Sequence, residues 1–98
     1  YLFFSTHSKK DLKIGSVVEQ NGLYCFYSDQ IDGTYKPVNK TGLVMDYGDS
    51  IYDVRLLEKE SGEYVGIGWR NKDSNGIFLG KLSHPMILKI NGDHVDVL

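Results

Sequence analysis

Short apolar and aromatic runs alternate with clusters of turn residues along the whole chain. Residues 51–57 alternate between apolar and polar side chains with a period close to two, as a half-buried strand does. Other runs share this short, β-branched and aromatic character: residues 1–6, 22–28, 63–69, 77–79, 86–90 and 94–98. Helical periodicity is hard to find. The pattern therefore predicts an all-β chain without a helix.

The turn residues indicate how some of these strands are joined. Ser61-Gly62 separates two strand runs and predicts a hairpin. Asn91-Gly92 predicts a second hairpin, because both residues tolerate positive φ. Residues 8–21 are the least regular and read as a long loop, with a weaker helical alternative. On these grounds a sandwich, a barrel and a propeller all remain possible, and residues 1–98 are expected to form one all-β unit.

Composition narrows the classes of partner. Hydrophobic residues make up 41% and charged residues 24%, and the formal net charge is -2, so no basic stripe for nucleic acid is present. No apolar run approaches the ~20 residues that span a bilayer, so no membrane partner is expected. Cys25, the only cysteine, is expected to be a buried, inert thiol.

The first strand run poses a pairing problem. An apolar segment such as Tyr1-Leu2-Phe3-Phe4 at a sheet edge needs a partner strand. Either the chain is a piece of a longer protein, or another chain supplies that partner. Apolar rows that include Leu2, Phe4, Ile87 and Ile90 would meet water, which predicts self-association through the strand of residues 1–6.

One segment resembles a known family. Residues 33–44, which read GTYKPVNKTGLV, are similar to a stretch that levansucrases and invertase-like enzymes carry in the late blades of a five-bladed β-propeller. Further landmarks follow in the order of that family: residues 1–7, residues 22–29, Tyr52 and residues 82–93. The resemblance implies about two blades of such a propeller, from its C-terminal part.

The same resemblance implies a glycoside hydrolase or fructosyltransferase that acts on sucrose-like or fructan-like sugars. These enzymes use a nucleophilic aspartate and an acid/base glutamate, which in the family precede the matched segment. No catalytic residue is therefore assigned here, no metal or cofactor is expected, and the isolated chain is predicted to be inactive. The alternatives are a free-standing β module that self-assembles or binds carbohydrate without cleaving it, and a structural β domain without a ligand.

The resemblance gives a hypothesis for a sugar-binding wall made of His7, Tyr52 and Arg70. His7 aligns with a basic residue that levansucrases place near the sugar, and Tyr52 with a tyrosine of a family strand. A phenol, an imidazole or a guanidinium can each bond a sugar hydroxyl. The competing interpretations are a solvated histidine, a packing tyrosine and a solvated arginine. Trp69 could stack on a sugar ring, although core packing is the simpler interpretation.

Two short motifs have plain structural interpretations. Residues 39–41 fit the sequon for N-glycosylation, but the same residues are typical of a turn. Gly66-Ile67-Gly68 begins like a dinucleotide-binding motif, but Asn71 replaces the third glycine and no helix is expected to follow.

Overall fold

The computed structural model describes residues 1–6, 13–14, 17–18, 21–48, 51–72 and 75–98. These residues form strands and connecting turns, with no helix among them, and hence no helix that could cross a membrane. The strands are β1 (Leu2–Thr6), β2 (Lys13–Ile14), β3 (Val17–Val18), β4 (Gly22–Tyr27), β5 (Lys36–Pro37), β6 (Leu43–Asp46), β7 (Ile51–Glu58), β8 (Tyr64–Lys72), β9 (Phe78–Leu82), β10 (Met86–Asn91) and β11 (His94–Val97).

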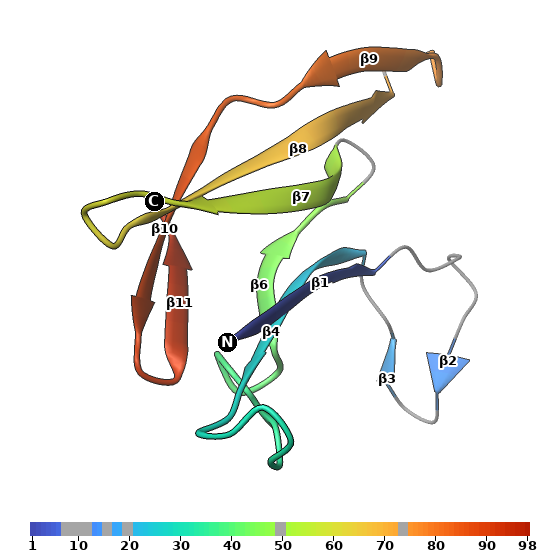
Figure 1. Cartoon of the computed structure of the whole chain (residues 1–98). Coiled ribbons are helices and arrows are strands. Elements are labelled where there is room, and N and C mark those ends of the chain that lie inside the picture. The colour runs from blue at the N-terminus through green and yellow to red at the C-terminus, as the bar shows by residue number, and fades with distance from the viewer. Residues whose placement is uncertain (7–12, 15–16, 19–20, 49–50, 73–74) are drawn as a thin grey trace.

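Two antiparallel sheets make up most of the described chain (Figure 1). In the first sheet, β4 is central: β1 pairs with one edge, and β5 and β6 pair with the other edge. In the second sheet, the order is β11-β10-β8-β7, and β9 pairs with β8 beside β10. The short β2–β3 ribbon forms a pair of its own. Strand β6 leads directly from the first sheet toward β7 of the second.

Strands β9 and β10 act as one bent strand along the same edge of β8. The first part of β8 pairs with β10 and the later part with β9. At the bend, the Ser83 backbone N–H donates to the Gly68 carbonyl at 2.7 Å, and the Gly68 N–H donates to the Ser83 hydroxyl at 3.0 Å. Ser83 thus completes the hydrogen bonds of the edge where the strand is interrupted.

The core lies between the two sheets. Leu23 and Cys25 point inward from β4, while Leu88 and Val95 point inward from β10 and β11. The buried residues are Leu23, Cys25, Val38, Tyr47, Val54, Leu88 and Val95. Burying one large aliphatic side chain stabilises the fold by roughly 1.5–3 kcal/mol. The core therefore holds the sheets face to face.

The two glycines of β8 make room for a bulge in β7. The register of β7 on β8 shifts between Tyr52 and Arg55, so two residues of β7, among them Val54, stand opposite Gly68. A Cβ on Gly68 would lie 2.8 Å from a Val54 methyl, and one on Gly66 would lie 3.0 Å from the other. The Gly-Ile-Gly motif is thus explained by packing, not by a nucleotide.

Asn39 joins the two sheets. Its side-chain amide donates to the Val95 carbonyl at 2.9 Å and to the Leu43 carbonyl at 3.1 Å, and its carbonyl oxygen accepts from the Val95 N–H at 3.0 Å. Its backbone N–H donates to the Asp93 carbonyl at 2.9 Å. Asn39 has a φ of 51°, which asparagine tolerates better than most residues. The segment that fits the sequon is therefore a turn whose asparagine amide is already bonded.

Tyr47 forms a second link between the sheets. Its phenol lies 2.7 Å from the Ser5 hydroxyl of β1 and accepts a hydrogen bond from the Val54 N–H of β7 at 3.1 Å. The bulge in β7 frees that N–H from the ladder. The Tyr47 side chain is buried, and burial raises the pKa of its phenol. A buried hydroxyl with both partners supplied stabilises this one arrangement of the sheets.

Most of the predicted strands are confirmed, and their positions match the apolar runs. Within the segment 8–21, residues 13–14 and 17–18 form the strands β2 and β3 where a loop or a helix was expected. Residues 8–12, 15–16 and 19–20 of that segment lie outside the described residues. In the second hairpin, Asn91 pairs with His94 as a strand residue, and Gly92 (φ 62°) alone takes positive φ, as a type II′ turn requires.

The expectation of exposed apolar rows is confirmed in part. Leu2 and Phe4 are exposed, and Ile87 is partly exposed. The prediction was wrong for Ile90, which packs against the core, because it lies on the same face of β10 as Leu88.

The Asn39 link predicts a large loss of stability for Asn39→Ala. Three side-chain hydrogen bonds are removed, and half-buried backbone groups of Val95 and Leu43 lose their partner. We expect the free energy of unfolding in urea to fall by about 2–4 kcal/mol.

A matched control lies in the same turn. Lys40 also has positive φ, at 66°, but no side-chain link to the second sheet is found for it among the described residues. Lys40→Gly relieves that backbone strain and should raise stability by up to about 1 kcal/mol. If both substitutions lowered the free energy of unfolding equally, stability would depend on the conformation of the turn and not on the hydrogen bonds of the Asn39 amide.

The buried thiol predicts a loss of stability at alkaline pH. Cys25 is fully buried, and burial raises the pKa of its thiol from near 9 to about 11. The folded state therefore favours the protonated thiol, so its contribution is complete below pH 9 and is lost as the pH rises toward 11. Over this interval, the wild-type chain should lose about 3 kcal/mol more than Cys25→Ala in urea titrations. A stability difference that does not change with pH would contradict this.

Candidate functional site

The structure locates two of the three residues predicted to bind sugar. Tyr52 lies in β7 and Arg70 lies toward the end of β8, which is the strand paired with β7. His7 lies outside the described residues. Tyr52 is partly buried and Arg70 is exposed. The two described residues thus belong to the same end of the second sheet.

The pairing of β7 and β8 sets the directions of these side chains. Tyr52 pairs with Trp69, whereas Arg70 pairs with Ile51. Neighbouring residues of a strand point to opposite faces of the sheet, so Arg70 and Trp69 lie on opposite faces. Tyr52 is the partner of Trp69, not of Arg70. The Tyr52 ring lies 6.5 Å from the ring of Phe78 in β9. The register alone therefore does not bring the phenol and the guanidinium together.

Trp69 is more exposed than a core residue. It is 39% exposed and pairs with Leu82 on one side and Tyr52 on the other. The simpler interpretation from the sequence, that Trp69 packs in the core, is therefore wrong for the described residues. Its ring lies on the outer face of the second sheet, away from the core.

The described carboxylates have ordinary structural roles. Asp46 accepts from the Gly48 N–H at 2.9 Å, as a turn residue does, and Asp53 pairs with Arg55 at 3.2 Å on the surface. Among the residues that the structure describes, no group of three potential metal ligands gathers at one point. Asp46 and Asp53 thus have local structural partners, as the sequence interpretation of turn and surface residues expects.

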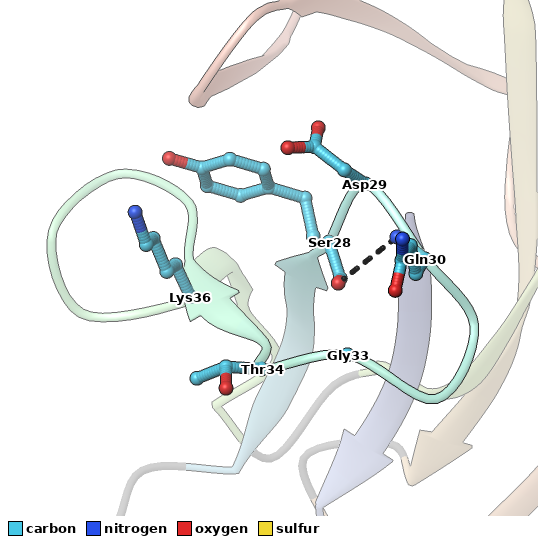
Figure 2. Close-up of a pocket in the computed structure, with 7 residues that line it drawn as sticks. Ser28, Asp29, Gln30, Gly33, Thr34 and Lys36 are labelled. Atoms are coloured by element: carbon cyan, nitrogen blue, oxygen red, sulfur yellow. Dashed lines mark hydrogen bonds between the residues drawn. The ribbon is translucent and has the colours of Figure 1, made fainter.

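A polar hollow lies beside the loop between β4 and β5. Its volume is about 280 Å³, and it is lined by Tyr27, Ser28, Asp29, Gln30, Gly33, Thr34 and Lys36. Figure 2 shows Lys36 and Gln30 on opposite sides of the hollow, with Thr34 and Gly33 along the loop between them. Hydroxyl, amide, carboxylate and ammonium groups can together donate to and accept from a polyol.

The loop around this hollow is folded tightly onto itself. The Gln30 backbone N–H donates to the Ser28 hydroxyl at 3.3 Å, and the Gly33 N–H donates to the Gln30 carbonyl at 3.0 Å. A Cβ on Gly33 would lie only 2.6 Å from the Ser28 hydroxyl oxygen. A side chain at residue 33 would therefore displace the Ser28 hydroxyl from the position in which it accepts from the Gln30 N–H.

Sequence reasoning identified this segment as a turn but not as a hollow. The polar cluster of residues 29–33 signalled a turn, and the lining residue Lys36 comes from β5, which was not predicted as a strand. Pairing of Tyr27 with Lys36 brings the two ends of the loop together. One signal in the sequence could have indicated the hollow: a cluster of polar residues between two strands that pair with each other.

Comparison with protein-family models found no match, and a search of curated proteins found no significant match. Among solved structures, the chain is similar to the inulosucrase from Halalkalicoccus jeotgali bound to kestose, with a TM-score of 0.80 and 22% sequence identity. The similarity covers 97% of this chain and 28% of the inulosucrase chain.

This likeness establishes the fold. Nearly the whole chain superposes on a part of a levansucrase-type enzyme, and the chain spans little more than a quarter of the length of that enzyme. The all-β prediction and the predicted fold, a part of a β-propeller, are thereby confirmed. The two sheets of this chain are arranged as a portion of a levansucrase-type β-propeller.

Proposed function

We propose that this chain is part of an enzyme that hydrolyses or transfers fructosyl units. The observation that carries the proposal is the fold likeness to an inulosucrase over 97% of the chain. A fold alone does not determine activity, so a second line of support is needed. The ordered landmarks in the sequence give that support, because they were recognised without the structure. The sugar would be of the sucrose or fructan class.

In this proposal the chain supplies binding groups and no catalytic carboxylate. His7, Tyr52 and Arg70 would contact the sugar, by carry-over from the family resemblance. Hydrogen bonds from such groups orient a substrate relative to catalytic groups held elsewhere. The nucleophile and the acid/base would come from sheets outside residues 1–98. The isolated chain would therefore bind or position sugar without cleaving it.

A segment exchange tests this proposal. The matched part of the Halalkalicoccus jeotgali inulosucrase would be replaced by residues 1–98, and sucrose turnover would be measured. We expect the chimera to turn over sucrose, and the isolated chain to give no turnover. In the chimera, Arg70→Ala should raise KM about 10-fold and Tyr52→Phe about 3-fold or more, with smaller effects on kcat.

Matched controls separate binding from folding in this experiment. Arg55→Ala removes an exposed arginine from the neighbouring strand, and Tyr35→Phe removes a phenol whose partner is the Ile31 carbonyl in a surface loop. Both should leave KM unchanged. A folded chimera without activity, or turnover by the isolated chain after further purification, would refute the proposal.

The polar hollow supports a second candidate, in which the chain binds carbohydrate without cleaving it. Its lining offers hydrogen-bonding groups of both kinds and the ring of Tyr27, on which a sugar could stack. We expect kestose at millimolar concentration to shift the backbone amide NMR signals of residues 27–36. Asp29→Ala combined with Lys36→Ala should abolish these shifts, while Lys89→Ala should not. Shifts that are absent, or spread over the whole chain, would exclude this candidate.

A further inference from the structure

Asp53 has a backbone conformation that a residue with a side chain rarely adopts inside a strand. Its φ is 49°, in the left-handed region, whereas the other described non-glycine residues with positive φ, Asn39 and Lys40, lie in a turn. This region is unfavourable for residues with a Cβ, although aspartate and asparagine tolerate it better than most. Such a conformation persists only where the surrounding structure fixes it.

The left-handed conformation belongs to the bulge in β7. Asp53 and Val54 together stand opposite a single residue of β8, Gly68. A bulge whose first residue is left-handed ordinarily has glycine at that position. Asp53 therefore stands where glycine would be free of strain.

The extra residue of the bulge decides which side chain of β7 enters the core. Ile51 and Val54 are three residues apart and would point to opposite faces of a regular strand. Here a Cβ on Gly68 would lie 2.9 Å from an Ile51 methyl and 2.8 Å from a Val54 methyl, so both residues face the core. Tyr52 pairs with Trp69 and shares its outer face. Without the bulge, Tyr52 would share the core face with Val54, and Ile51 would point outward.

Buried contacts hold the bulge in this one conformation. The Val54 N–H donates to the Tyr47 phenol at 3.1 Å, and the Val54 methyls occupy the space beside the two glycines of β8. The Asp53 carboxylate accepts from two nitrogens of the Arg55 guanidinium at 3.2 and 3.3 Å. That ion pair is exposed, so it contributes little. The backbone of Asp53 is thus fixed from the core side, and not through its charge.

We propose that Asp53 is a positioning residue for Tyr52 in the candidate sugar site, because its left-handed backbone directs the phenol away from the core. The Tyr52 ring still touches core residues, but it also meets the Phe78 ring of β9 at 6.5 Å. The property that matters is the tolerance of residue 53 for positive φ. The inference rests on the proposed function for the role of Tyr52 as a sugar contact, whereas the direction of the phenol is independent of that function.

A series of substitutions at residue 53 separates conformation from charge. All four variants remove the carboxylate, but Asp53→Gly and Asp53→Asn retain tolerance for positive φ, and Asp53→Ala and Asp53→Val do not. In the isolated chain, an NMR NOE between the Tyr52 and Phe78 rings should be present in the wild type and in the Gly and Asn variants. It should weaken in Asp53→Ala and disappear in Asp53→Val. Circular dichroism would check folding, and Asp53→Ala, the milder change, keeps the test valid if Asp53→Val does not fold.

The inulosucrase chimera measures the consequence for sugar binding. Asp53→Val should raise KM for sucrose about 3-fold, as Tyr52→Phe does, with a smaller effect on kcat. Asp53→Gly should restore the wild-type KM. In a Tyr52→Phe background, Asp53→Val should cause no further increase, because the phenol that it misplaces is already absent.

Arg55→Ala is the control for the exposed ion pair, and it should change neither the NOE nor KM. Three results would overturn the proposal: equal NOE or KM values in the wild type and all four variants, losses in Asp53→Gly and Asp53→Asn as large as in Asp53→Val, or additive effects in the double variant. A wild-type chimera without turnover would instead refute the proposed function. The NOE series needs no sugar and would still decide whether Asp53 directs Tyr52.

Discussion

The arrangement of the two sheets depends on the Asn39 side chain, whose amide makes the hydrogen bonds that a backbone amide would make in a strand. The Asn39 amide donates to and accepts from Val95, just as a neighbouring strand would, across a sequence separation of 56 residues. Tyr47 adds a second link, to Ser5 and Val54. Apolar contact between sheets is not directional. These polar links therefore fix the register in which the core residues meet.

Irregularities in the strands make these links possible. The turn that holds Asn39 lies between β5 and β6. Both ends of the turn are bonded to Cys25: the Val38 N–H donates to the Cys25 carbonyl, and the Cys25 N–H donates to the Gly42 carbonyl. The bulge in β7 releases the Val54 N–H for Tyr47, and glycines in β8 accommodate the displaced valine. Each departure from a regular ladder thus supplies a group that reaches across to the other sheet.

Local patterns sufficed to predict the longer strands, but not the two-residue strands β2, β3 and β5 or the links between the sheets. Alternation in residues 51–57 and the turn at Ser61-Gly62 are properties of neighbouring residues, so they could be recognised in the sequence. The partner of Asn39 depends on packing between distant strands, which no local pattern encodes. The hollow near Ser28 depends in the same way on the pairing of Tyr27 with Lys36. The position of His7 relative to Tyr52 and Arg70 stays a prediction.

The bonded Asn39 amide has a consequence for the way the chain is produced. Its sequon can accept a glycan only while the chain is unfolded, because the same nitrogen later bonds two backbone carbonyls. In a secretory expression host, glycosylation and folding would therefore compete for one atom. A chain modified there would carry a bulky polar group at the junction of the sheets. Production in bacteria, or the substitution Thr41→Ala, which removes the sequon, avoids glycosylation of Asn39.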